Sequence, residues 1–374
     1  MKRVGLIITN LAGSGAEKIV IQLARMFQSK DIDVHIFLLE NVIRYEHIED
    51  LKIYFLSEKR DLYKASKIVG DKLLALKLKK IVNKIESDGI KFDLFLSNSP
   101  SADRVMCVAQ FPNTRYVIHN SYAFEIKEFR EMGKVRRAEK KLKLYRRIYK
   151  GGDLITVSEG AKRDLKLLDI DYKTCQTIYN PFDFEEIRKL GSKESDLPEQ
   201  PYLLSASAFR FVKRHDILLS AYAKLKNPPP LKLLCPSNPE LVKLIKKFGL
   251  EEKVEILGFK TNPYPYIKNA KILLLSSERE GLPTVLIEAL ILGTPIVSTD
   301  CVSGPSEILT GELSQYLAKV NDSDDLAVKI SMALENYPKI DKVYIERFRK
   351  ENIYDEYKKI FDNKLEEVSK HDER

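Results

Sequence analysis

The chain has few cysteines and no long apolar run. Its four cysteines are spread over 374 residues with at least 60 positions between neighbours, which excludes a disulfide framework and a C-x-x-C metal or redox pair. The longest apolar runs, such as 272–275, fall far short of the roughly 18 residues that a spanning helix requires. The first residues lack the apolar core and cleavage site of a secretory signal, so we expect a cytoplasmic protein.

Glycine and proline are also sparse, with 16 of each, and no short unit repeats. Collagen-like and wholly disordered chains are therefore excluded, because 44% hydrophobic and 31% charged residues are typical of soluble globular proteins. At roughly 100 to 200 residues per domain, the length predicts two domains.

The net charge of +9 is concentrated in two segments. Residues 59–84 carry nine Lys or Arg against two Asp, and residues 127–150 carry eleven against three Glu. In each segment apolar residues recur at spacings of three and four, which predicts amphipathic helices that cover a sheet. The apolar stripes are Leu74, Leu78, Ile81 and Ile85 in the first segment, and Val135, Ala138, Leu142, Tyr145 and Tyr149 in the second.

The remaining basic faces admit two interpretations. They are solvated helix surfaces, or they bind an anionic membrane surface or an acidic acceptor. We expect no nucleic-acid partner, because the chain shows neither aromatic stacking platforms nor a nucleic-acid-binding module.

Short apolar runs alternate with helical stretches along the chain, first up to about Asn180 and again from Tyr202. Such alternation predicts parallel sheets with helices on both faces. The expected fold is α/β, with two doubly wound, Rossmann-like domains that face each other across a cleft. The predicted boundaries are 1–185 for the first domain, 186–200 for a polar linker, 201–339 for the second domain, and 340–374 for a helical segment that crosses back to the first domain.

A glycine loop, Gly13-Ser14-Gly15, lies between the first predicted strand and helix, where small residues let backbone amides approach a phosphate. The dinucleotide fingerprint G-x-G-x-x-G is incomplete, because Lys18 stands where its third glycine would be. A nicotinamide-dependent oxidoreductase is thus one alternative function, and a basic nucleic-acid-binding protein is another.

The stretch from Glu280 to Glu288 combines an acid after a strand, a Gly and Pro turn, and a helix that starts near Thr284. The first amides of that helix, at Thr284 and Val285, are available for a pyrophosphate. Glu288, one turn into the helix, can accept hydrogen bonds from ribose hydroxyls. The alternative is an ordinary helix start with favourably placed acids.

These residues resemble a known family. The run 277–290, followed by 293–300, is similar to the E-x7-E signature of glycosyltransferase family 4, whose members are retaining enzymes of GT-B fold. Other matches occur in the family's order along nearly the whole chain: the glycine loop Gly13–Glu17, His119-Asn120, Val157-Ser158-Glu159, Asn180-Pro181-Phe182-Asp183 and Ser303–Glu307.

The resemblance implies a role for each matched residue. Glu288 would hold the ribose, the amides of Thr284 and Val285 the diphosphate, and Glu280 the donor sugar. Arg210 and Lys213 would form a cationic pair on the departing diphosphate, Gly15 would close over the phosphate, and His119 would lie near the donor sugar or the acceptor.

We therefore expect a retaining hexosyltransferase that moves a hexose from a nucleotide-diphosphate sugar, most simply a UDP-sugar, to a glycan or lipid-linked acceptor in surface polysaccharide or lipopolysaccharide biosynthesis. It would need no cofactor and no metal, because cationic side chains would offset the charge that a metal offsets elsewhere. Two D-x-D sequences, Asp31–Asp33 and Asp169–Asp171, are expected not to bind metal. The basic segments 59–84 and 127–150 would make the enzyme peripheral at the inner face of the cytoplasmic membrane.

Overall fold

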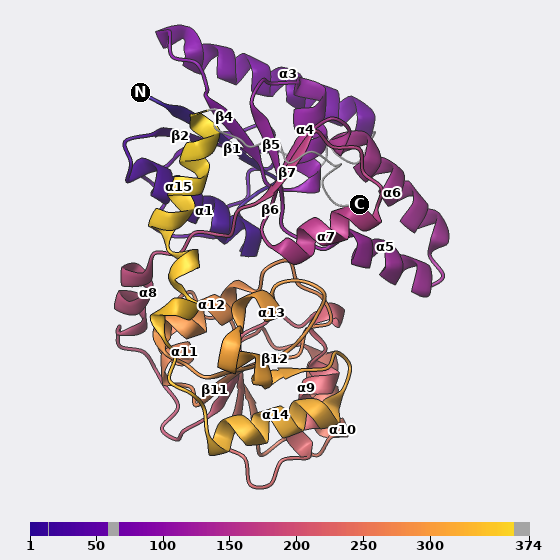
Figure 1. Cartoon of the computed structure of the whole chain (residues 1–374), viewed down its shortest axis with the longest axis vertical. Helices are drawn as coiled ribbons and strands as arrows, with labels where there is room; N and C mark the ends of the chain where they lie inside the picture. Colours follow the sequence, from indigo (N-terminus) through magenta and orange to yellow (C-terminus); the bar gives the residue numbers. More distant parts are fainter. Residues whose placement is uncertain (14, 59–66, 363–374) are drawn as a thin grey trace. The chain divides into compact units, whose positions relative to one another are not determined.

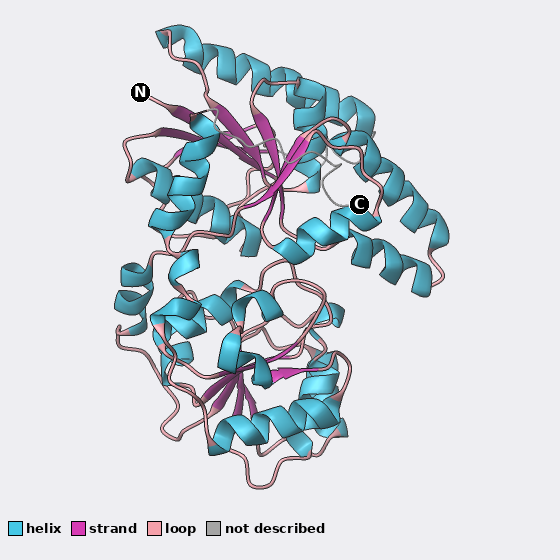
Figure 2. Ribbon diagram, in the orientation of Figure 1, coloured by secondary structure: helices cyan, strands magenta, loops and turns pink. Residues whose placement is uncertain are grey.

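The computed structural model describes residues 1–13, 15–58 and 67–362. Contacts divide the chain into two compact units, Met1–Pro181 together with Lys350–Arg374, and Phe182–Arg349. Each unit contains a parallel sheet with helices on both faces (Figure 2). Serine, asparagine or aspartate side chains cap the first turns of six helices, which fixes their starts at Pro100, Tyr122, Glu159, Phe184, Pro239 and Ser323.

Unit 1 has a seven-stranded sheet in the order β3-β2-β1-β4-β5-β6-β7, and all of its strand pairs are parallel. The strands are β1 (Arg3–Ile8), β2 (Asp33–Leu38), β3 (Lys52–Phe55), β4 (Leu94–Ser97), β5 (Thr114–Ile118), β6 (Asp153–Thr156) and β7 (Thr174–Thr177). The helices are α1 (Gly15–Gln28), α3 (Lys67–Ile85), α4 (Pro100–Ala109), α5 (Tyr122–Glu131), α6 (Val135–Tyr149), α7 (Glu159–Leu167) and α15 (Lys350–Phe361).

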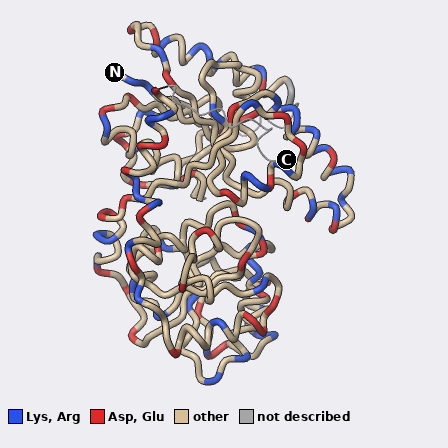
Figure 3. Tube along the Cα trace, in the orientation of Figure 1, with Lys and Arg blue, Asp and Glu red and all other residues tan. Residues whose placement is uncertain are grey.

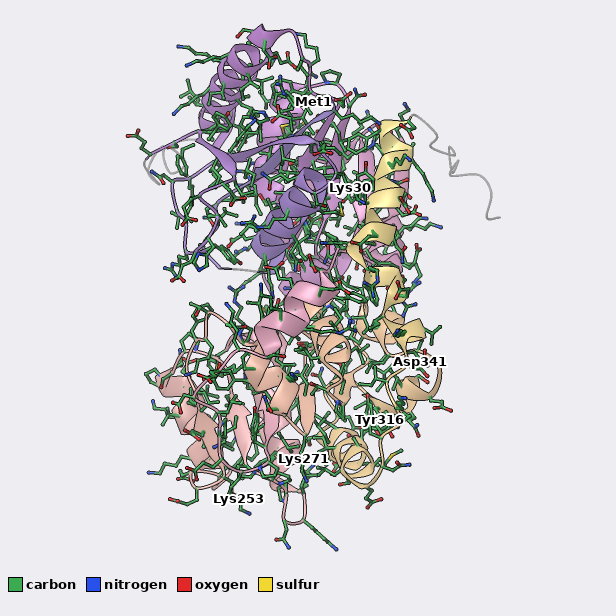
Figure 4. The ribbon with its side chains drawn as sticks, turned by 90° about the vertical axis from the view of Figure 1, so that its left-hand side faces the viewer. Met1, Lys30, Lys253, Lys271, Tyr316 and Asp341 are labelled. Carbon is green, nitrogen blue, oxygen red and sulfur yellow. The ribbon has the colours of Figure 1, made fainter. Side chains whose placement is uncertain are left out.

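Helices α3, α4, α5 and α6 cover one face of this sheet and share a core with it, whereas α1 and α15 pack together on the other face (Figure 1). Phe27 of α1 meets Tyr357 of α15 edge to face, and the ammonium of Lys30 lies 5.3 Å from the centre of the Tyr354 ring. Figure 4 labels Lys30 beside α15. The C-terminal helix is thus part of unit 1.

Unit 2 has a six-stranded sheet in the order β10-β9-β8-β11-β12-β13. Its strands are β8 (Leu203–Ser205), β9 (Leu231–Leu233), β10 (Val254–Ile256), β11 (Ile272–Leu275), β12 (Ile296–Thr299) and β13 (Leu317–Ala318). Its helices are α8 (Phe184–Gly191), α9 (His215–Ala223), α10 (Pro239–Lys247), α11 (Tyr264–Asn269), α12 (Thr284–Leu292), α13 (Pro305–Ile308) and α14 (Ser323–Glu335). Helices α9, α10 and α14 share a core with one sheet face, and α8, α11 and α12 pack together.

The structure differs from the sequence-based boundaries around the expected linker. Residues 184–191 form α8, which packs on α11 and α12 of unit 2. A β-carbon on Gly191 would lie 2.6 Å from Leu292 Cδ2, so α8 reaches α12 through a residue without a side chain. The predicted helical segment at 340–374 is, over the described residues, two short 3₁₀ turns followed by α15.

The first basic segment continues into α3, which carries lysines, and the second covers the end of α5 and all of α6, which carries lysines and arginines (Figure 3). Residues 59–66 of the first segment lie outside the described residues. The predicted apolar stripe of α6 is wrong at one position: Val135 is 51% exposed, because it stands in the first turn of the helix, beyond the core that Ala138 and Leu142 enter. No described helix combines the length and the apolar character needed to cross a bilayer.

Candidate active site

The strand order of the unit 2 sheet reverses between the adjacent parallel strands β8 and β11: β9 and β10 lie on one side of this pair, and β12 and β13 on the other. In open parallel sheets, ligands bind beyond the carboxyl ends of the strands at such a switch point. The loop after β8 carries Arg210 and Lys213, and the loop after β11 carries Glu280. The fold therefore brings together two segments that are more than 60 residues apart in sequence.

Lys213 and Glu280 form an ion pair at this point. The Nζ atom of Lys213 lies 2.5 Å from Oε1 of Glu280, and the two side chains are 22% and 11% exposed. An ammonium group has three N–H donors, and no second side-chain bond of Lys213 occurs among the described residues. The pair is thus accessible and leaves donors for an anion.

Hydrogen bonds hold both loops at the backbone. Ser276 Oγ donates to the carbonyl of Lys213 at 2.8 Å, and the amide of Glu278 donates to the carbonyl of Val212 at 2.8 Å. Ser303 Oγ donates to the carbonyl of Glu280 at 2.7 Å. The two loops are therefore fixed to each other and to the loop after β12.

Gly304 allows this third loop to approach. It has a φ of +100°, and a β-carbon there would lie 2.3 Å from Pro283 Cδ. Only glycine meets both conditions without displacing the turn that precedes α12. The family resemblance includes segment 303–307 but predicts no role for it. In the structure, Ser303 of this segment holds the backbone of Glu280 in place.

Helix α12 begins at Thr284 without a side-chain cap. Thr284 and Val285 are partly exposed residues, and within the described part of the chain their amides make no hydrogen bond. A helix N-terminus of this kind favours a bound anion through its unpaired N–H groups and its dipole. Glu288 lies one turn further on and is buried.

The two arginines of the β8 loop differ. Arg210 is exposed, and no described residue pairs with its guanidinium. Arg214 is bound to Asp216 at 2.8 Å and to Glu278 at 3.3 Å, and these contacts raise its pKa above the usual value. Arg214 thus shapes the loop, whereas Arg210 is available to a ligand.

The remaining predicted site residues, Gly15 and His119, belong to unit 1. Gly15 begins α1, is exposed, and has open space where a side chain would project. Gly13 adopts a φ of +106°, and its amide donates to the carboxylate of Glu17 at 2.5 Å. This loop follows β1, and the neighbouring strand β4 marks the switch point of the unit 1 sheet.

His119 follows β5 and contacts Asn98, a residue that the sequence reasoning missed. The Nδ2 atom of Asn98 donates to the carbonyl of Leu96 at 2.9 Å, so its Oδ1 is the acceptor for His119 Nε2 at 3.1 Å. Burial lowers the pKa of His119 to about 4. The imidazole is therefore neutral at pH 7, carries its proton on Nε2, and keeps Nδ1 as an acceptor.

In the first D-x-D sequence, Asp33 is engaged in two ion pairs. Asp33 starts β2, at the amino end of the strands, where it pairs with Arg3 at 2.7 Å and Lys52 at 2.6 Å. Asp169 lies in a turn after α7 with a φ of +49°. Within residues 1–13, 15–58 and 67–362, no three His, Cys, Asp or Glu side chains are grouped to hold a metal ion.

Comparison with known proteins matches both halves of the chain. The model described as "Glycosyltransferase Family 4" matches residues 13–186, and that of "Glycosyl transferases group 1" matches residues 186–351. Over 360 residues the chain is 30% identical to the N-acetylgalactosamine-N,N'-diacetylbacillosaminyl-diphospho-undecaprenol 4-alpha-N-acetylgalactosaminyltransferase of Campylobacter jejuni, and the match spans 92% of this chain and 93% of that enzyme. The chain belongs to glycosyltransferase family 4.

Solved structures agree on the architecture of this glycosyltransferase. The Anabaena protein HepE, in complex with UDP and glucose, superposes with a TM-score of 0.73 at 17% identity and covers 97% of this chain and 100% of its own. Sucrose-phosphate synthase from Thermosynechococcus elongatus gives a TM-score of 0.75 at 18% identity, with 97% and 99% covered. The transferase therefore has the GT-B fold that the sequence predicted, and the family membership sets aside the oxidoreductase and nucleic-acid alternatives.

Proposed function

We propose that this transferase moves a hexose from UDP-hexose to a glycan or lipid-linked acceptor, with retention of the anomeric configuration and without a metal ion. The Lys213–Glu280 pair beside the uncapped start of α12 carries the proposal. It places a cation, an acid and free amides at the β8/β11 switch point, where a nucleotide-diphosphate sugar has complementary groups.

Each residue has a part that its geometry suits. Lys213 has two further N–H donors for the leaving diphosphate, and the exposed Arg210 and the amides of Thr284 and Val285 add to them. Together they would offset the negative charge that develops as the glycosyl bond breaks. Glu288 would hold the ribose hydroxyls, and Glu280 the hydroxyls of the donor sugar.

The chemical step is a front-side displacement. The bond between the anomeric carbon and the diphosphate oxygen breaks while the acceptor hydroxyl forms its bond on the same face. The hydroxyl proton passes to a diphosphate oxygen. Because the acceptor attacks the anomeric carbon directly, no protein side chain becomes covalently attached. His119, neutral and held by Asn98, would accept a hydrogen bond from a sugar hydroxyl through Nδ1.

The relatives support the donor and acceptor classes. HepE was solved with UDP and glucose, and the name of the Campylobacter enzyme specifies an acceptor on diphospho-undecaprenol. We therefore propose a UDP-sugar donor and an acceptor of surface polysaccharide or lipopolysaccharide biosynthesis. The lysines and arginines of α3 and α6 would hold the enzyme to anionic lipids at the cytoplasmic face of the membrane.

The test is calorimetric titration of UDP, GDP and NAD into the purified protein in EDTA, repeated with Glu288→Gln. UDP binding that persists in EDTA and weakens in the variant would support the proposal. Glu251→Gln, an exposed glutamate of the same unit, is the matched control and should bind UDP like the wild type. A preference for GDP would contradict the donor, and the absence of any binding without a divalent ion would contradict metal independence.

A further inference from the structure

Helix α3 has apolar side chains on two opposite faces. Leu74, Leu78 and Val82 enter the core of unit 1. Val69, Leu73 and Leu76 point away from it and are 56%, 51% and 65% exposed. Because these three are spaced by four and three residues, they lie on one side of the helix and form an outer apolar stripe.

The outer stripe continues as a row of cations. At 100° per residue, Lys77, Lys80 and Lys84 fall on the same side of α3 as Leu73. All three lysines are exposed, and within the described residues none forms an ion pair. The outer side of α3 is therefore apolar in its first half and basic in its second.

The other basic helix lacks this combination. The apolar residues of α6, from Ala138 to Tyr149, are used in the core, and Val135 is its exposed apolar side chain. Apart from Val135, α6 offers electrostatic attraction only, whereas α3 offers attraction and a stripe of three apolar side chains. Basic residues next to a Leu-rich stripe are typical of helices that lie in a membrane interface.

We propose that α3 is the membrane-inserting helix of this enzyme, with Val69, Leu73 and Leu76 at the boundary between lipid headgroups and acyl chains and with Lys77, Lys80 and Lys84 on anionic headgroups. This inference rests on the membrane part of the proposed function. An anionic bilayer fits better than a protein partner, because the lysine row requires an extended surface of negative charge along the same side as the stripe.

The chain contains no tryptophan, so Leu76→Trp provides a single fluorescent reporter on the stripe. The full chain is mixed with phosphatidylglycerol vesicles or with phosphatidylcholine vesicles. We expect a blue shift with phosphatidylglycerol, and quenching by lipids that are brominated on the acyl chain. Leu167→Trp, at a still more exposed leucine of α7, is the control and should show neither.

Two further variants separate the contributions. Leu73→Ser with Leu76→Ser should lower the partition into phosphatidylglycerol vesicles at least about tenfold, because two inserted apolar side chains are lost. Replacing Lys77, Lys80 and Lys84 with glutamine should weaken the preference for anionic lipid, while the basic residues of α6 keep part of it. UDP affinity should be unchanged in both variants, since α3 belongs to unit 1 and the predicted nucleotide groups belong to unit 2.

Vesicle binding without a change in the Leu76→Trp emission would overturn the inference and leave the membrane proposal intact. No vesicle binding at all would overturn both, while UDP titration would still report on the transferase proposal. A blue shift that grows with protein concentration in the absence of lipid would overturn the inference in favour of contact with a second copy of the chain.

Discussion

Replacing Lys213 with methionine removes the ammonium and keeps most of the aliphatic stem, so it isolates the charge. The structure places this ammonium 2.5 Å from Glu280, whose side chain is 11% exposed. Loss of one charge-assisted hydrogen bond to the diphosphate costs about 1.5–3 kcal/mol, or roughly a 10- to 150-fold weaker UDP affinity. If the charge grows as the glycosyl bond breaks, turnover should fall further, by about 10²–10³.

The assay is calorimetric UDP titration in EDTA together with UDP release from the accepted UDP-sugar. Lys271→Met is the matched control, because Lys271 (labelled in Figure 4) is exposed and directly precedes β11, at the strand end opposite Glu280. The double variant Lys213→Met with Glu280→Gln should bind UDP more tightly than Lys213→Met alone, because it removes a carboxylate that has lost its cation. UDP affinity and turnover equal to those of the wild type in Lys213→Met would refute the reasoning.

Three further predictions concern the groups around the candidate site and the unit 1 core. Gly304→Ala should destabilise unit 2 by about 1–3 kcal/mol, seen as a lower urea midpoint, because its β-carbon would meet Pro283. Asn98→Asp should raise the pKa of His119 above about 4, followed by NMR titration, because a carboxylate 3.1 Å from Nε2 favours the imidazolium. Burial raises the pKa of Asp103 from 3.8 to about 8. Between pH 3.8 and about pH 8, the folded chain therefore keeps the Asp103 proton, whereas the unfolded chain has lost it. Stability should therefore fall as pH rises towards 8, by at most about 1.4 kcal/mol per unit, and an Asp103→Asn variant whose unfolding free energy keeps the wild-type pH slope would contradict this.

Most strands were predictable because they are buried on both faces of a parallel sheet and appear as short apolar runs. The strands that the sequence did not reveal are β3, β7 and β13. They form sheet edges, where Lys52 and Thr174 can occupy exposed or half-exposed positions. The segment 186–200 resembled a linker because it is polar, yet Phe184 and Ile187 bury one side of α8 against unit 2.

The sequence provided the chemistry of the candidate site but not its contacts. The run from Glu280 to Glu288 is local, so its turn and helix could be predicted from adjacent residues. The bond between Lys213 and Glu280 depends on the pairing of β8 with β11, which no local pattern specifies. The role of Ser303 and the residue Asn98 itself were not predicted for the same reason: each acts through a residue that is distant in sequence.

The basic helices show a different limit of periodicity. The stripe from Leu74 to Ile85 predicts the face of α3 that enters the core. It does not predict the exposed apolar residues on the opposite face, which the sequence analysis described only as basic. A helix with two apolar faces satisfies the same spacing rule twice, and only packing decides which face is covered. Salt screens exposed cations but not apolar contact. Membrane binding through α6 alone would therefore be lost at high ionic strength, whereas binding through α3 would keep the part of its affinity that comes from its exposed leucines.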